Sequence, residues 1–131
     1  MNSDIRGVTR TAGAMLVLAA AIACSPVEVA EADVRVQAAD NGLSILNGRG
    51  ASIYYFAIDR QAAAVALMLW APCIDPETCD RVDPRASRQV ASVDVLGWGA
   101  SDEVILYWWH LVPAGAGRFR PDSIRSLIVP L

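Results

Sequence analysis

Short apolar runs separated by turn residues follow one another along most of the chain. In the first of them, Val34, Val36 and Ala38 alternate with Arg35 and Gln37. This period of two is the pattern of a strand with one buried face and one exposed face. Clusters of Gly, Asn, Asp and Pro interrupt the runs and are typical of turns. The pattern predicts about seven short elements, over residues 34–38, 43–46, 53–58, 61–70, 89–96, 104–112 and 123–131.

Two of these runs, 53–58 and 104–112, are apolar at nearly every position and rich in aromatic and β-branched residues. Such runs are typical of central strands whose two faces are both covered. The run 61–70 allows two interpretations. Its alanines favour a helix with Asp59 as a cap, whereas its continuous apolar character up to Trp70 fits a strand that follows one helical turn. We predict the strand.

Long amphipathic helices, which would indicate an α/β fold, are missing between the runs. The sequence therefore predicts an all-β fold, an antiparallel β-sandwich of about seven short strands over residues 33–131. In its spacing this region is similar to the immunoglobulin-like and fibronectin-III-like domains of bacterial surface and periplasmic proteins. The Cys-Trp-Cys arrangement of antibody domains is not present, because Cys73 and Cys79 are too close in sequence to join two sheets.

The first 23 residues have the organisation of a secretory signal peptide. Arg6 and Arg10 precede an apolar run over residues 12–23, and small residues end that run. Such a signal requires a positively charged N-terminal region, a short apolar core and small residues at the cleavage site. The run would form a helix of only about 18 Å, whereas a spanning helix crosses roughly 30 Å of hydrocarbon. We therefore predict a signal peptide over residues 1–23, in the form of a helix.

The signal ends in Ala21-Ile22-Ala23-Cys24, which resembles the lipobox of bacterial lipoprotein precursors. In that family the cysteine sulfur receives a diacylglycerol, the signal is cut before the cysteine, and the new amino terminus is acylated. The resemblance implies that Cys24 is lipidated and that its acyl chains hold the protein stably on a membrane of the cell envelope. Residues 24–32 are short and acidic, and we predict that they form the tether between the lipid and the domain.

Two other interpretations of this segment stay open. In one, Cys24 follows an ordinary cleavage site by chance, and the mature protein is a soluble secreted or periplasmic β domain. In the other, the segment is an uncleaved single-pass anchor. We favour a lipoprotein that faces the periplasm or the cell surface. Ser25, directly after Cys24, resembles the residue found in precursors that are sorted to the outer membrane.

Composition and charge narrow the range of partners. Two of the eleven basic residues and one of the fourteen acidic residues lie in the signal, so the mature chain carries nine arginines, thirteen acidic residues and a net charge of −4. An acidic chain without a basic cluster is unlike a nucleic-acid-binding protein. We expect no nucleic-acid partner. The mature length suits one domain with its own core.

The cysteine count agrees with a lipidated Cys24. The chain has three cysteines, an odd number for a secreted protein. If Cys24 carries lipid, Cys73 and Cys79 remain as a pair in an oxidising compartment. We therefore predict a disulfide between Cys73 and Cys79, which closes one loop and stabilises it by about 2 kcal/mol on the chain-entropy model.

Few residues of the sequence are candidates for catalysis or metal binding. His110 is the one histidine in the chain, so any Ser-His-Asp or Cys-His arrangement would have to use it. It lies within a strand-like run, which favours a structural role over a hydrolase. The carboxylates of the cysteine loop could bind a hard cation, but their spacing matches no known calcium loop, so we predict a solvated acidic loop (Asp75, Glu77, Asp80 and Asp83). We predict no catalytic site, metal or cofactor.

The aromatic residues are the best candidates for recognition. Neighbouring residues of a strand point to opposite faces, so one of Trp108 and Trp109, and at least one residue of the 54–56 run, must face outward. Exposed aromatic area is what protein and carbohydrate recognition uses. We predict a binding surface for an envelope protein or a glycan from Tyr55, Trp98, Trp108, Trp109 and Phe119. The alternative is that residues 61–70 and the cysteine loop cover that face.

Overall fold

The computed structural model describes residues 26–66 and 69–131. The signal peptide predicted over residues 1–23, its helix and the lipid attachment point Cys24 therefore lie outside the described residues. Within them the chain forms eight strands, one α-helix and a short 3-10 turn, η2 (Ser92–Asp94). The elements are β1 (Glu28–Glu31), β2 (Val34–Ala39), β3 (Gly42–Asn47), β4 (Ile53–Asp59), α1 (Arg60–Ala66), β5 (Arg81–Val82), β6 (Ser87–Ala91), β7 (Glu103–Gly115) and β8 (Arg118–Pro130).

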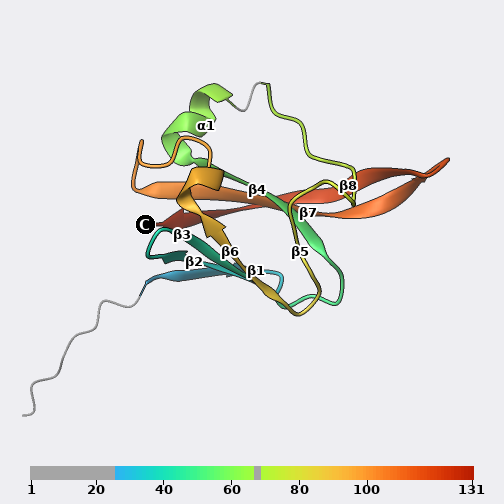
Figure 1. Cartoon of the computed structure of the whole chain (residues 1–131), viewed down its shortest axis with the longest axis horizontal. Coiled ribbons are helices and arrows are strands. Elements are labelled where there is room, and N and C mark those ends of the chain that lie inside the picture. Colours follow the sequence, from blue (N-terminus) through green and yellow to red (C-terminus); the bar gives the residue numbers. More distant parts are fainter. Residues whose placement is uncertain (1–25, 67–68) are drawn as a thin grey trace, which may run out of the picture.

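The strands form two antiparallel four-stranded sheets, in the orders β1-β2-β3-β6 and β5-β4-β7-β8. In Figure 1, strands β4, β7 and β8 lie above β1, β2 and β3. One core cluster draws buried side chains from both sheets, including Val36 and Ile45 from one sheet and Leu106 and Trp108 from the other. The predicted all-β fold of two packed antiparallel sheets is confirmed. Eight strands form where about seven were predicted.

The folded part begins earlier than the sequence predicted. Residues 24–32 were expected to be a tether, but Glu28–Glu31 form β1 and pair with β2. Val29 packs against the core from this strand, and burial of apolar surface stabilises its pairing. The prediction of an unstructured stretch is therefore wrong for these four residues, and the domain starts at Glu28.

The run 61–70 forms a helix longer than the one helical turn predicted, and its residues 69–70 do not form the predicted strand. Helix α1 occupies Arg60–Ala66. The Asp59 carboxylate accepts hydrogen bonds from the backbone N–H groups of Gln61 and Ala62, which is the contact that an N-cap residue makes. The cap and the high helix propensity of alanine outweigh the apolar character of the run. After the helix, Trp70 lies in an irregular segment that crosses the outer side of the sheet.

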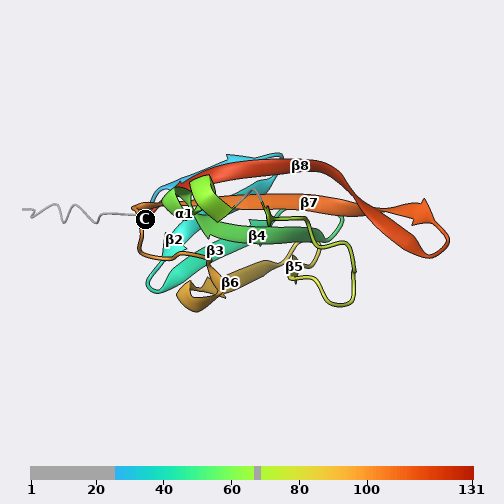
Figure 2. The ribbon, with the colours of Figure 1, turned by 90° about the horizontal axis from the view of Figure 1, so that it is seen from above.

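Strands β7 and β8 form one hairpin that is much longer than predicted. The turn expected over residues 113–117 is confined to its last residues, since Gly115, Ala116 and Gly117 have φ angles of 88°, 50° and 72°. Residues 118–122 continue β8 up to this turn although they alternate little in polarity. Strand β4 pairs with β7 only as far as Trp109. Residues 110–122 therefore extend from the sandwich as a two-stranded projection, here called the arm (Figure 2).

The arm lies at the end of the domain opposite to the start of β1 (Figures 1 and 2). Glu28 pairs with Gln37, beside the β2–β3 turn. The backbone N–H of Ser92, from η2, donates to Asn41 in that same turn. This end is therefore closed by the β2–β3 turn and η2, and the other end carries the arm and the cysteine loop. No helix in residues 26–66 and 69–131 is long and apolar enough to cross a membrane.

Candidate functional site

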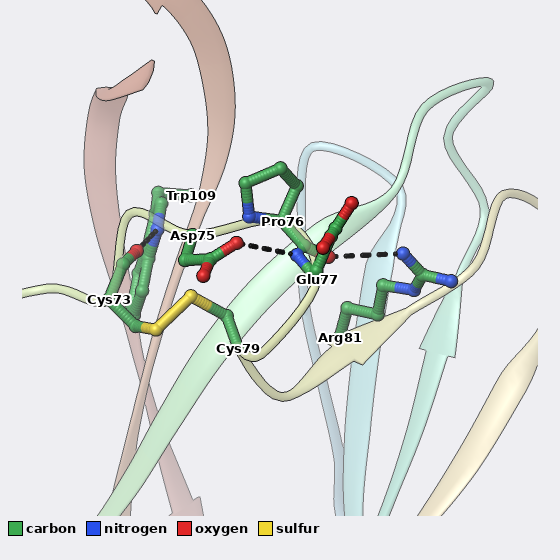
Figure 3. Close-up of a disulfide and its surroundings, with 7 residues drawn as sticks. All are labelled: Cys73, Asp75, Pro76, Glu77, Cys79, Arg81 and Trp109. Carbon is green, nitrogen blue, oxygen red and sulfur yellow. Dashed lines mark hydrogen bonds between the residues drawn. A yellow bond between two sulfur atoms is a disulfide. The ribbon is translucent and has the colours of Figure 1, made fainter. Parts of the chain in front are cut away.

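The cysteine loop is fixed at several points (Figure 3). The predicted disulfide between Cys73 and Cys79 is confirmed, with Cα atoms 5.7 Å apart. Inside the loop, the Asp75 carboxylate accepts a hydrogen bond of 2.9 Å from the backbone N–H of Glu77. Outside it, the indole Nε1–H of Trp109 donates to the carbonyl of Cys73 over 3.1 Å. These contacts hold the loop against the sheet and restrict its conformations.

An aromatic cluster fills the space between this loop and the sheet. Phe56 and Tyr107 reach outward from β4 and β7, on the side away from the main core. The ring of Trp70 stacks on Phe56 at 5.2 Å between centroids and lies 5.4 Å from Tyr107 and 5.8 Å from Trp109. Offset and edge-to-face aromatic pairs of this kind add about 1 kcal/mol each beyond their burial. We call these four residues the outer aromatic cluster.

A groove of about 420 Å³ lies between the cysteine loop and the tip of the arm. Its apolar surface comes from Ile74 and Pro76 of the loop and from Phe119 of the arm. Arg118 supplies a positive charge on the arm side, while the loop side carries carboxylates. The full lining is Ile74, Asp75, Pro76, Glu77, Gly117, Arg118 and Phe119. We call it the cysteine-loop groove.

The structure corrects most of the predicted binding surface. Tyr55 is only 9% exposed and Trp108 only 1%, because both point into the main core. Trp109 does face outward, as alternation requires, but it is also 1% exposed because Trp70 and the cysteine loop cover it. The prediction of an exposed surface is therefore wrong for these three residues. Trp98 is half-buried against the main core, and Phe119 alone of the five lines the groove.

Both ring nitrogens of His110 take part in hydrogen bonds within the fold. Nε2 accepts from Nε–H of Arg49 over 2.8 Å, so Nδ1 carries the proton and donates to the carbonyl of Ser52 over 2.9 Å. The imidazole therefore joins the start of the arm to the β3–β4 loop, and among the described residues the hydrogen-bond partners of its two nitrogens are a guanidinium and a carbonyl, not a hydroxyl group.

The carboxylates of the cysteine loop and its surroundings make separate contacts. Asp80 pairs with Arg88 at 3.2 Å and Asp83 with Arg81 at 3.2 Å, whereas Asp75 bonds within its own loop. These side chains therefore do not point at a common centre. Among the described residues, no three His, Cys, Asp or Glu side chains form a group that could hold a metal ion.

Sequence reasoning missed two features of this end of the domain. Arg49 and Arg85 line one cavity with His110 from separate loops, and neither belongs to a motif that would have revealed it. The groove itself depends on residues 74–77 of the disulfide loop lying beside residues 117–119 of the arm, which are forty or more residues away in sequence. Only the Arg118-Phe119-Arg120 triplet could have pointed to it, because an aromatic residue between two arginines beside a glycine turn is an exposed arrangement.

Comparison of the sequence with protein-family models and with curated proteins, and of the structure with solved structures, finds no match.

Proposed function

We propose that this protein is a lipid-anchored lipoprotein of the cell envelope whose β-sandwich is a non-catalytic binding domain. Cys24 would carry the lipid, and the partner would be another envelope protein or a glycan. The observation that carries the binding role is the cysteine-loop groove. It combines exposed apolar surface with carboxylates on a loop held by a disulfide and a positive charge, Arg118, on the arm.

The position of the groove supports this proposal. Only three residues separate Cys24 from Glu28, the first residue of β1. Even a fully extended chain of that length reaches at most about 14 Å, so a lipid on Cys24 would hold the β1 end of the domain close to the membrane. The arm is at the opposite end (Figure 1), and the groove lies beside its tip. A partner could therefore reach them without contacting the lipid surface. An outer-membrane location is part of the proposal.

The rigidity of the groove also favours recognition. A preformed site loses less conformational entropy on binding than a mobile one. The disulfide, the hydrogen bond from Trp109 and the Asp75 contact all restrain the loop side of the groove. The hydrogen bonds that occupy both nitrogens of His110 favour this binding role over the alternative of a hydrolase.

The immunoglobulin-like class of the sandwich remains a proposal. Two antiparallel sheets around a shared core support it. Strands β1, β2 and β3 are neighbours in sequence order within one sheet, whereas immunoglobulin domains place their second strand beside the fifth. The proposal therefore concerns the general architecture and not the order of the strands.

Two experiments test the proposed function. For the anchor, cells would be labelled with palmitate, and incorporation into the protein would be compared with that into Cys24→Ala. We expect label in the wild type and none in the variant, and equal labelling would refute the lipid attachment. For the groove, a photo-crosslinking amino acid would replace Phe119, with the 89% exposed Val93 at the other end of the domain as control. A specific adduct at position 119 alone is expected, and equal adducts at both positions would refute the assignment.

A further inference from the structure

A second cavity lies on the other face of the arm, at its base. Along β7, Leu111 faces the outer aromatic cluster, so His110 and Val112 face the opposite way. A cavity of about 540 Å³ opens there, between the arm and the loops at the end of the sandwich. Its lining includes Arg49, Arg85 and His110, with Asp33 and Asp122 as its acidic residues. We call this cavity the notch.

Arg49 is held in place by contacts on several sides. Its Nη1 donates to the carbonyl of Ala32 over 2.9 Å, and its Nε donates to Nε2 of His110 over 2.8 Å. The guanidinium carbon lies 5.8 Å from the centre of the Trp108 ring, within the distance of a cation–π interaction. A guanidinium has five N–H donors, so these two hydrogen bonds leave three N–H groups for a ligand. The side chain is thus oriented before any ligand arrives.

Arg85 brings a second guanidinium to the notch from the β5–β6 turn. Its backbone has a φ of 58°, a conformation that non-glycine residues rarely adopt. Its Nη1 donates to the carbonyl of Gly48, beside Arg49 in the β3–β4 loop. Arg85 therefore reaches, from a different part of the chain, the loop that carries Arg49.

Neither arginine is neutralised within the part of the chain that the structure describes. Five other arginines there each lie within 4.0 Å of a carboxylate: Arg35, Arg60, Arg81, Arg88 and Arg125. For Arg49 and Arg85, no such ion pair forms among the described residues, although Asp33 and Asp122 line the same cavity. Both aspartates are exposed to solvent, where water screens their charge. Guanidinium groups with unused donors favour a ligand that accepts hydrogen bonds and carries negative charge.

We propose that the notch binds an oxyanion, either a carboxylate or a phosphate group, through Arg49 and Arg85. The site is distinct from the cysteine-loop groove and does not depend on lipid attachment at Cys24. Both candidate ligands present negatively charged oxygens that a guanidinium can bind with two parallel hydrogen bonds. The notch lies at the base of the arm, and the arm is at the end of the domain opposite to the start of β1 (Figure 1). The notch would therefore be accessible from the same side of the domain as the cysteine-loop groove.

The test uses the full-length protein, labelled with ¹⁵N and held in a non-ionic detergent. Its arginine Nε–H signals would be followed by NMR while sodium phosphate or sodium acetate is added, with sodium chloride at equal ionic strength as reference. We expect saturable shifts of the Arg49 and Arg85 signals with phosphate, acetate or both, and the more effective salt identifies the class of oxyanion. Shifts that do not saturate, or that chloride reproduces, would overturn the proposal.

Charge variants sharpen the test. Arg85→Gln should weaken binding about tenfold, as expected for the loss of about 1.4 kcal/mol. Arg35→Gln is the matched control, because it removes the same charge from an exposed arginine outside the notch. It should leave the affinity unchanged. Asp122→Asn removes a negative charge from the lining and should strengthen binding. Equal effects of the two arginine variants would contradict a site in the notch.

Discussion

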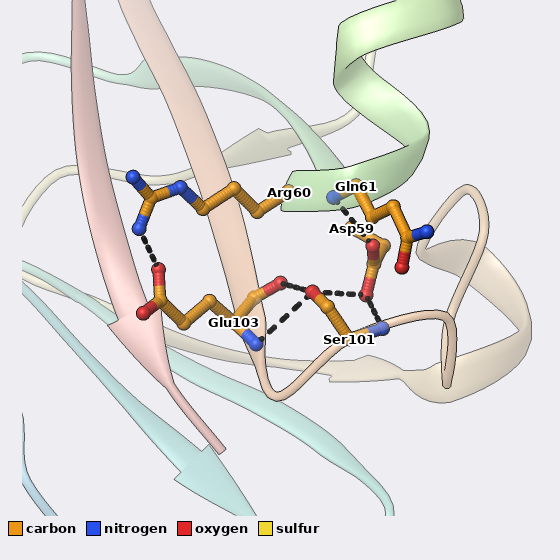
Figure 4. Close-up of polar contacts among 5 residues, drawn as sticks. All are labelled: Asp59, Arg60, Gln61, Ser101 and Glu103. Carbon is orange, nitrogen blue, oxygen red and sulfur yellow. Dashed lines mark hydrogen bonds and ion pairs between the residues drawn. The ribbon is translucent and has the colours of Figure 1, made fainter.

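The carboxylate of Asp59 joins the end of β4 to the loop before β7 through Ser101. Its Oδ2 accepts the backbone N–H of Ser101 over 2.8 Å and the hydroxyl of the same residue over 3.0 Å (Figure 4). Its Oδ1 accepts from the N–H groups of Gln61 and Ala62 at the start of α1. One fully buried side chain therefore fixes both the helix and the loop.

Because of these contacts, the unfolding free energy of the domain depends on pH in the acidic range. Burial alone would raise the pKa of Asp59, but the hydrogen bonds from Ser101, Gln61 and Ala62 outweigh it and hold the pKa below its usual range. An unfolded aspartate has a pKa of about 3.9. The stabilisation is therefore fully present above about pH 4 and is lost as the pH falls below that value toward the lower folded pKa.

The variant Asp59→Asn tests this dependence. The NH2 group of the asparagine amide cannot accept a hydrogen bond, and it would face either the two donors of Ser101 or those of the helix. We therefore expect a loss of about 2 kcal/mol of unfolding free energy at pH 7. Urea unfolding between pH 7 and pH 2.5 should show the difference from wild type shrinking below about pH 4. Asp102→Asn serves as control, because that side chain is exposed. A difference that stays constant with pH would contradict the role given to the ionised carboxylate.

Removal of the disulfide should increase the mobility of the cysteine loop while leaving the two sheets folded. Replacing Cys73 and Cys79 with serine should lower the unfolding free energy by about 2 kcal/mol, the value for so short a loop. The two sheets should persist, because their shared core does not include this loop. Hydrogen exchange would show faster exchange in residues 73–80 and little change in β2 and β3. Loss of protection throughout both sheets would contradict this expectation.

Tyr55 should ionise later than an ordinary tyrosine. Burial raises the pKa of Tyr55 to about 12, with Arg88 lowering it and Asp80 and Asp94 raising it further. The folded pKa is above the unfolded value of about 10. The resulting stabilisation is present below about pH 10 and is lost as the pH rises toward 12.

Absorbance at the tyrosinate band, followed against pH, would show the shift. One of the three tyrosines should titrate near pH 12, and that step should disappear in Tyr55→Phe. Circular dichroism at each pH would confirm that the chain is still folded. Ionisation of all tyrosines near pH 10 in the folded protein would refute the burial of this phenol.

A glycine is required at position 42, where β3 pairs with β6, because a side chain there would clash with β6. The φ of Gly42 is 153°, and a Cβ atom there would lie 1.8 Å from the carbonyl oxygen of Val90. Gly42→Ala should therefore separate the β3–β6 pair and cost about 3 kcal/mol or more of unfolding free energy. Gly50→Ala is the control, since no atom lies within 4 Å of its Cβ position. Similar urea midpoints for the two variants would contradict the close approach of Gly42 to Val90.

The alternation of apolar and polar residues by itself determined that the chain forms strands, because a strand places alternate side chains on opposite faces. The lack of long amphipathic helices between the runs favoured antiparallel pairing. Cys73 and Cys79 were likewise predictable as a pair, since they are the two cysteines that remain if Cys24 carries lipid. The central positions of 53–58 and 104–112 followed from apolar residues on both faces, and β4 and β7 pair as neighbours.

Tertiary structure alone decided what covers each face. Trp109 points outward as alternation requires, yet it is buried, because Trp70 and the cysteine loop lie over it. Strand β1 and the outer part of β8 form through pairing with β2 and β7, and their own sequences carry only a weak strand pattern. The groove and the notch each combine residues from distant segments. Local patterns report on neighbours in sequence, whereas cavities arise from the packing of segments that are far apart.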